Sequence, residues 1–148
     1  MKFWFACLGW LFATAAAAQV GGLYISGTNF TFREAVERGI AMNPNSTRFF
    51  VLAVGDAVRG LSVVAPPDLV EIRNRGAAAG AFYLVCQRDL DSGDFSLTDL
   101  VPGVVPVRGF PPRGSTELPH GERYFPGEDP STLPESNELL RRLRATCS

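Results

Sequence analysis

The sequence predicts an α/β fold: a three-layer domain with a mostly parallel sheet of four or five strands in the middle. Three observations lead to this prediction. The continuous apolar runs at 49–54 and 82–86 are typical of strands that are buried on both faces, as in a parallel sheet. Shorter apolar segments at 23–26 and 104–107 have the length of strands. Helical patterns separate these segments, and strands that alternate with helices form βαβ units with helices on both faces of the sheet.

The segment 23–26 is predicted to be the first strand, and the helix after it has a clear start. Thr31 and Glu34 have the T-x-x-E spacing of a capping box. Apolar residues then recur at helical spacing, namely Phe32, Ala35, Val36 and Ile40. The helix is predicted to end near Asn43, because the residue before Pro44 disfavours helical geometry.

The second strand, 49–54, is followed by an ambiguous segment and then by a second helix. The residues 57–65 are compatible with a short strand or with a loop over the sheet edge. Pro67 and Asp68 are predicted to open the helix, with proline at its first position and an acid in its first turn. Gly80 is predicted to end it.

The third strand, 82–86, ends on a cysteine where the sequence turns abruptly polar. We expect a polar turn at 87–93, and then a one-turn helix whose S-x-x-D capping pattern is formed by Ser96 and Asp99. A Pro-Gly break precedes the fourth strand at 104–107.

The rest of the chain is predicted to be less regular. The segment 109–121 is rich in proline and glycine and is expected to form an extended loop. A short edge strand is predicted at 123–125 and a turn at 130–134. The last helix is predicted at about 134–146, with an apolar stripe and a basic end that complements the helix dipole. The stripe consists of Leu139, Leu140 and Leu143, and the basic residues are Arg141, Arg142 and Arg144.

The first eighteen residues have the pattern of a secretory signal peptide. Lys2 supplies a positive charge, 3–13 is apolar, and 15–18 offers small residues for cleavage. The apolar run is shorter than the roughly twenty residues that span a bilayer. We therefore expect a periplasmic or secreted bacterial protein, with a single domain at 19–148 and no stable membrane insertion after cleavage.

The charge balance and the motifs narrow the range of functions. Lys and Arg together number 14 and Asp and Glu 15, so no basic excess points to nucleic acid as a partner. No C-x-x-C, H-E-x-x-H or P-loop motif occurs, and we predict no cofactor and no metal. The acids Asp89, Asp91 and Asp94 lack EF-hand spacing and favour a solvated turn. His120, the single histidine, is expected at the surface of the proline-rich loop.

Two cysteines, Cys86 and Cys147, follow the predicted signal peptide. An even pair in an exported protein suggests a disulfide. Cys147 follows Leu140 and Leu143 at seven and four residues and so shares their predicted core-facing stripe. Such a bridge would close a loop of about 60 residues and stabilise the fold by roughly 4 kcal/mol in the chain-entropy estimate.

Cys86 is also a candidate catalytic thiol. It stands at the carboxyl end of a predicted central strand, where open α/β sheets place their sites. A thiol reacts as its thiolate, and Arg88, two residues later, is a candidate stabiliser of that charge. The residues alone leave three alternatives open: a catalytic thiol, half of a disulfide, and an inert buried thiol.

The central segment resembles the DsrE/DsrF-like family of sulfur-relay proteins. The resemblance rests on a strand that ends in cysteine (82–86), a polar turn with a glycine (87–93), and the D-L-x-P-G-V pattern at 99–104. It extends more weakly over about 23–110 and includes the strand and glycine turn at 49–55. It implies a flavodoxin-like fold, frequent homo-oligomers, and a persulfide on Cys86, formed when a thiolate accepts sulfane sulfur.

The C-terminal part departs from that family. The proline-rich loop replaces the family's helix and final strand, and Cys147 has no counterpart in the family pattern. The tail 133–148 resembles small exported proteins of integrating conjugative elements. Two main hypotheses therefore stand: sulfur relay through Cys86, or a non-enzymatic periplasmic accessory protein with an unknown protein partner and a Cys86–Cys147 disulfide. A thiol-disulfide exchanger that uses both cysteines is a third.

Overall fold

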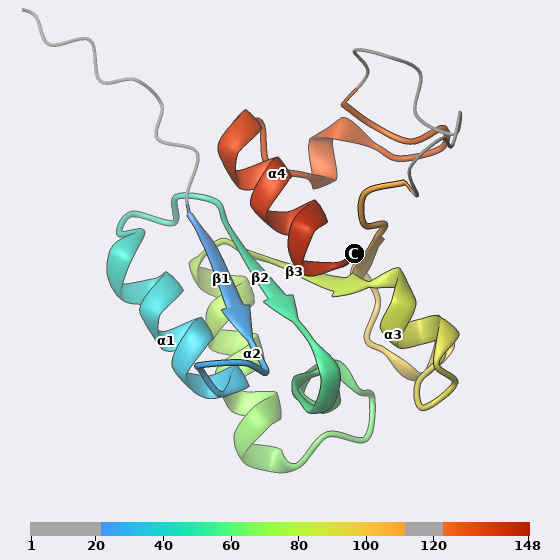
Figure 1. The fold of residues 1–148 in the computed structure, drawn as a ribbon. Coiled ribbons are helices and arrows are strands. Elements are labelled where there is room, and N and C mark those ends of the chain that lie inside the picture. Colours follow the sequence, from blue (N-terminus) through green and yellow to red (C-terminus); the bar gives the residue numbers. More distant parts are fainter. Residues whose placement is uncertain (1–21, 112–122) are drawn as a thin grey trace, which may run out of the picture.

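The computed structural model describes residues 22–111 and 123–148. The predicted signal peptide and His120 lie outside these residues. Four strands form an all-parallel sheet, and their order across it follows their order in the chain (Figure 1). The strands are β1 (Leu23–Ser26), β2 (Phe49–Ala53), β3 (Ala81–Cys86) and β4 (Val105–Val107). The predicted α/β class is therefore confirmed, and the number of strands in the described residues is four.

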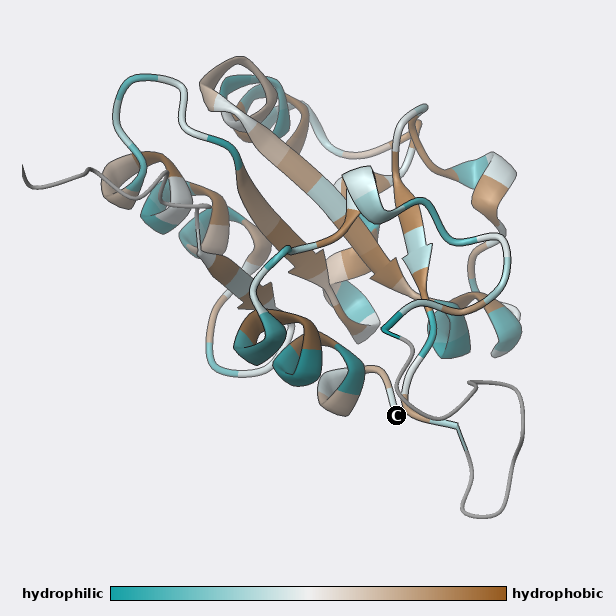
Figure 2. Ribbon diagram, turned by 90° about the horizontal axis from the view of Figure 1, so that it is seen from above, coloured by the Kyte–Doolittle hydropathy of each residue, from teal (hydrophilic) through white to brown (hydrophobic). Residues whose placement is uncertain are grey.

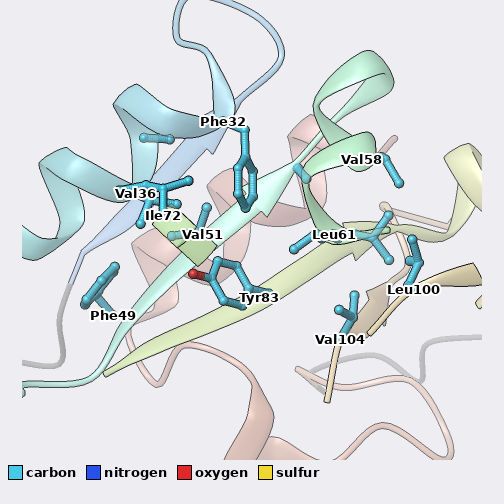
Figure 3. Packing of buried hydrophobic residues seen from close by; sticks show 13 residues of the cluster. Phe32, Val36, Phe49, Val51, Val58, Leu61, Ile72, Tyr83, Leu100 and Val104 are labelled. Carbon is cyan, nitrogen blue, oxygen red and sulfur yellow. The ribbon is translucent and has the colours of Figure 1, made fainter. Parts of the chain in front are cut away.

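One face of the sheet is covered by the helices that connect the first three strands. Helix α1 (Phe32–Met42) joins β1 to β2, and α2 (Pro67–Ala79) precedes β3. Val36 and Ile72 from these helices are fully buried against Val51 and Val85 of the central strands. Figure 3 shows this apolar cluster around Val51 and Tyr83. The helices of this core lie next in sequence to the strands that they cover.

The opposite face is covered by α4 (Asn137–Thr146), which lies on the other side of the sheet from α1 and α2 (Figure 1). Leu140 and Leu143 of α4 pack with Phe50, Leu52 and other buried residues of the sheet. In Figure 2 the central strands are coloured mainly as hydrophobic, whereas the helices carry both hydrophobic and hydrophilic residues. The predicted apolar stripe of the last helix is thereby confirmed, and so is the three-layer arrangement.

The ends of the helices follow the capping signals in the sequence. The Thr31 hydroxyl accepts a hydrogen bond from the Glu34 N–H at 3.2 Å, and the Glu34 carboxylate accepts one from the Thr31 N–H at 2.8 Å. Helix α2 has proline at its first position and ends at Gly80, whose φ of 108° favours glycine. Both predicted capping devices are confirmed.

Several local predictions need correction. The ambiguous segment after β2 forms a 3-10 helix, η1 (Gly55–Leu61), and the segment predicted as a polar turn begins with a short helix, α3 (Gln87–Asp91). The one-turn helix after Ser96 is present as η2 (Leu97–Asp99), and a further turn, η3 (Pro130–Thr132), precedes α4. No strand forms at 123–125 in the described part of the chain. Helix α4 begins at Asn137, later than predicted, because Ser136 is its N-cap and accepts from the Leu139 N–H.

None of the helices in residues 22–111 and 123–148 combines the length and the apolar character that a membrane span requires.

Candidate functional site

Cys86 is the last residue of β3 and is completely buried. The parallel register pairs it with Val107 of β4. Its side chain belongs to the core on the α4 face of the sheet, together with Leu84 two residues earlier. In a strand, residues two apart point to the same face. The position at the carboxyl end of a central strand is therefore as predicted, but the sulfur faces the interior of the protein.

The sulfur of Cys86 is bonded to that of Cys147 in a disulfide. The two Cα atoms lie 5.1 Å apart although the residues are 61 positions apart in the chain. Cys147 is the C-cap residue of α4 and is only 4% exposed. The disulfide therefore fastens the end of α4 to the central strand, and the disulfide alternative for the two cysteines is the one that the structure contains.

Arg88 lies in α3, directly after β3, and its side chain reaches the chain segment that carries Cys147. Its guanidinium donates a hydrogen bond to the main-chain oxygen of Ser148. The structure thus brings together the three predicted site residues, Cys86, Arg88 and Cys147. Because the disulfide leaves Cys86 no thiol to ionise, Arg88 has no thiolate to stabilise in this state.

A close approach of two chain segments covers the disulfide. A Cβ atom at Gly109 would lie 2.5 Å from the Cys147 main-chain oxygen and 2.5 Å from the Ser148 Cα atom, so only glycine fits there. The next N–H, of Phe110, donates to the Ser148 hydroxyl at 2.9 Å. The segment after β4 therefore packs closely against the end of α4, next to the disulfide.

A buried ion pair is formed by Arg144, which precedes Cys147 by three residues in the chain. The Arg144 guanidinium donates to both carboxylate oxygens of Glu128, at 2.9 and 3.1 Å. It also donates to the main-chain oxygens of Arg108 and Arg123, at 2.9 and 3.0 Å. The side chain of Arg144 is 3% exposed and that of Glu128 12%, so this network is largely shielded from solvent. Such bidentate pairs with additional acceptors fix the geometry of the groups they join.

Sequence reasoning missed this network. Arg144 is predicted to complement the helix dipole near the end of the last helix. In the structure it is buried and joins α4 to residues on both sides of the 112–122 segment. A signal existed in part: Arg144 follows Leu140 at four residues and so lies on the core-facing side of the helix. Nothing in the sequence pattern identifies Glu128 as its partner.

A separate cleft of about 650 Å³ lies at the carboxyl ends of β1 and β2. Its charges are mixed, because Arg33 and Arg59 share it with Glu34, Asp56 and Asp68. The Glu34 carboxylate already caps the start of α1 at this place, and an anion at that helix terminus would meet it. Neither Cys86 nor Cys147 lines the cleft, so the cleft is not part of the Cys86 site.

Two of the acids after Cys86, Asp89 and Asp91, accept hydrogen bonds within the protein. An Asp89 carboxylate oxygen accepts from the Gly55 N–H at 3.1 Å, and one of Asp91 accepts from the Gln87 amide at 3.0 Å. Within residues 22–111 and 123–148, no group of three or more His, Cys, Asp or Glu side chains is arranged to hold a metal ion.

Comparisons with known proteins place the chain in no family. No protein-family model matches it, and no solved structure gives a significant match. Among curated proteins, the chain is similar to a histidine–tRNA ligase of Halorubrum lacusprofundi, with 32% identity over 101 aligned residues. The aligned region covers 53% of this chain and 23% of the ligase. The chain thus spans about a quarter of the length of this curated relative, and a match of that extent assigns it no activity.

Proposed function

We propose that this chain is a non-enzymatic, exported accessory protein in which the Cys86–Cys147 disulfide has a structural role. The observation that carries the proposal is the burial of both cysteines in one disulfide, with the sulfur of Cys86 on the α4 face of the core. A thiol that exchanges sulfur needs access to its partner, whereas a structural disulfide needs none.

The surroundings of the bridge support the same role. Gly109, Phe110 and Arg88 all contact the Cys147–Ser148 segment through main-chain approach or hydrogen bonds. Each contact holds the end of α4 against the sheet, and none prepares an open site beside the sulfur. Disulfides persist in the oxidising periplasm, which is where the predicted signal peptide would direct the protein. The resemblance of residues 133–148 to exported proteins of conjugative elements suggests conjugative transfer as its setting.

The alternative, sulfur relay through Cys86, requires the bridge to be open. The thiolate would then attack the outer sulfur of a donor persulfide, keep that sulfur as its own persulfide and release the donor as a thiolate, with Arg88 as the nearby cation. The resemblance of 82–86 and 99–104 to DsrE-like proteins motivates this hypothesis, and it stays a prediction. The same experiment separates it from the accessory role.

The test is a thiol count on the mature protein from the periplasm, by intact mass after alkylation with and without reductant. We expect no alkylation before reduction and a mass about 2 Da below that of the reduced chain. A persulfide, which adds about 32 Da and is lost on reduction, would contradict the proposal and support sulfur relay. Two thiols that react without reductant would contradict it as well.

A second arm asks whether Cys86 can accept sulfur at all. Incubation of the native protein with inorganic polysulfide is expected to leave its mass unchanged. The variant Cys147→Ser frees the Cys86 thiol and is the matched control, because it shows whether the thiol reacts once the bridge is absent. Persulfide formation on the native protein at the rate of this variant would overturn the structural role of the disulfide.

A further inference from the structure

Strand β1 lies at one edge of the sheet, and in the described residues no strand pairs with its outer side. The Phe50 N–H donates to the Gly22 oxygen and the Val54 N–H to the Ser26 oxygen. Because the main-chain groups of alternate residues point to opposite sides of a strand, those of Leu23 and Ile25 point to the open edge. An edge with free main-chain donors and acceptors can accept a further strand.

A groove of about 320 Å³ runs along this edge, between helices on the two faces of the sheet. Helix α1 contributes Ala35 and Arg38 to it, and α4 contributes Arg142. Residues of β1 itself, Leu23, Tyr24 and Ile25, form its floor. The groove therefore exposes the strand edge with one arginine above the sheet and one below it.

Both arginines are available to a partner. The guanidinium carbon of Arg38 lies 4.4 Å from the centre of the Phe30 ring, and this stacking holds the Arg38 side chain at the groove. In the described part of the chain, neither Arg38 nor Arg142 forms an ion pair. The acids near Arg38 on α1 have other roles: Glu34 caps the helix and Glu37 pairs with Arg33.

The charges decide which occupant fits. A second copy of this chain, paired edge to edge through β1, would place arginines against arginines whether the strands ran parallel or antiparallel, because both walls of the groove carry one. Like charges in direct opposition are destabilising. An extended segment with acidic side chains would instead pair with both.

We infer that the β1 edge binds an extended acidic segment of a partner protein, which adds a fifth strand to the sheet. The side chains of the added strand alternate between the two faces. Arg38 and Arg142 lie on opposite faces, so the two acids must be adjacent or three apart in the partner, and acids two apart would satisfy only one arginine. The spacing of the two acids is therefore expected to determine which partner segments this surface binds.

The inference gives the proposed accessory role a docking surface and in that sense rests on it. The two tests remain distinguishable, because peptide binding at β1 is measured on the oxidised protein and the thiol count does not involve β1. A protein that passes the thiol count and fails the binding test would keep its structural disulfide and lose this docking surface.

The probe is a short, acetylated and amidated peptide of valine and threonine with two adjacent glutamates at its centre. Binding to the full mature protein is measured by isothermal titration calorimetry, and protection of the Leu23 and Ile25 amides by hydrogen exchange. We expect saturable binding that weakens at higher ionic strength, together with slower exchange of both amides. The control peptide has the same composition with the glutamates two residues apart, and is expected to bind more weakly.

Backbone pairing is tested by N-methylation of alternate peptide residues. Methylation in one phase removes the N–H groups that face β1 and should abolish binding, whereas methylation in the other phase should preserve part of it. Equal loss in both phases would mean that the peptide does not add as a strand, and would overturn the inference.

The roles of the two arginines are tested by substitution. Arg38→Ala and Arg142→Ala should each weaken binding by roughly two- to fivefold, as expected for exposed ion pairs. The double variant Arg38→Glu/Arg142→Glu should prefer the corresponding lysine peptide. Arg141→Ala is the matched control, because Arg141 is exposed on the same helix but does not line the groove.

Three further results would contradict the inference. These are equal affinity for the glutamate and lysine peptides, unchanged binding in both arginine variants, and a wild-type dimer in sedimentation that protects Leu23 and Ile25 without peptide. The last result would assign the β1 edge to a second copy of this chain.

Discussion

The two faces of the sheet are covered in different ways. On one face, α1 and α2 are parts of βαβ connections, so each helix is tied at both ends to strands that it covers. On the other face, a single ten-residue helix, α4, comes from beyond the last strand. Within residues 22–111 and 123–148 the first face has no covalent cross-link, whereas the second has the disulfide and the buried Arg144–Glu128 pair. Chain connections thus hold α1 and α2 on one face, and side-chain interactions hold α4 on the other.

The difference follows from the cost of ordering a distant segment. A helix inside a βαβ unit is placed by short connections, so little additional entropy is lost when it packs. Helix α4 must be held in place by the apolar contacts of its ten residues and by groups at its end. A cross-link between positions 61 apart removes conformational freedom from the unfolded chain and favours the packed arrangement. We therefore expect the α4 face to depend on specific residues far more than the α1–α2 face does.

The largest effect is expected from removal of the disulfide. Cys86→Ala/Cys147→Ala should lower the free energy of unfolding by about 4 kcal/mol, because the unfolded chain regains the freedom of the long loop. Denaturant unfolding of the oxidised wild type and the variant measures the difference. Wild type in the presence of reductant is the control that deletes no atoms. Equal stability of all three would contradict a structural role for the bridge.

The next effect is expected at the buried ion pair. Arg144→Met should cost about 3 kcal/mol, because it leaves the Glu128 carboxylate without its bidentate partner in a largely buried place. Arg141→Met, at an exposed position of the same helix, should change stability little. The double variant Arg144→Met/Glu128→Gln should recover part of the loss, and a loss as large as that of the single variant would mean that the pair is not coupled.

The next effect is expected in the packing of the α1–α2 face. A Cβ atom at Gly39 of α1 would lie 2.2 Å from a ring carbon of Phe49, which is fully buried and has no room to move. Gly39→Ala should therefore destabilise by about 2 kcal/mol, despite the better helix propensity of alanine. Thermal unfolding measures this loss of stability. Gly93→Ala, at an exposed turn, is the comparison: the φ of 90° at Gly93 strains a residue with a side chain, but its Cβ atom would have no neighbouring atom within 4 Å.

The smallest effect is expected at a single buried hydrogen bond. The Tyr83 hydroxyl donates to the Arg73 main-chain oxygen at 2.6 Å, so Tyr83→Phe should cost about 1 kcal/mol. Burial raises the pKa of this hydroxyl well above its ordinary value, and the Arg73 charge offsets this only in part. Because the raised pKa belongs to the folded state, the stability it contributes is complete below about pH 10 and falls as the pH rises further. The phenylalanine variant should lack this alkaline decline.

The regular elements of the fold were predictable because their signals are local. The buried run 49–54, the capping box of Thr31 and Glu34, and the Gly80 end of α2 each depend on neighbouring residues only. The short helix α3 was not predicted, because its five residues, QRDLD, include a single apolar residue and so show no helical periodicity. The predicted strand at 123–125 is absent from the described residues, since the Arg123 main-chain oxygen serves the Arg144 guanidinium instead.

The residues of the candidate site could be predicted from the sequence, but whether the two cysteines are bonded to each other could not. The strand-end position of Cys86 and the core-facing position of Cys147 were readable from periodicity. Whether they pair depends on which face of the sheet α4 covers, and that is a property of the whole chain. The same holds for Arg144, whose acceptors come from two segments, one on each side of 112–122. It also holds for Gly109, which is required by a contact with residues nearly forty positions later.

Hydrogen exchange of α4 in the oxidised and reduced protein tests directly whether the disulfide holds this helix on the sheet. Reduction is expected to lower the protection of the Leu143 and Cys147 amides by up to roughly a thousandfold. The amides of Val36 and Ile72, on the face without a cross-link, should lose much less. An equal loss on both faces, or unchanged protection of α4, would contradict the claim that the Cys86–Cys147 disulfide holds this helix on the sheet.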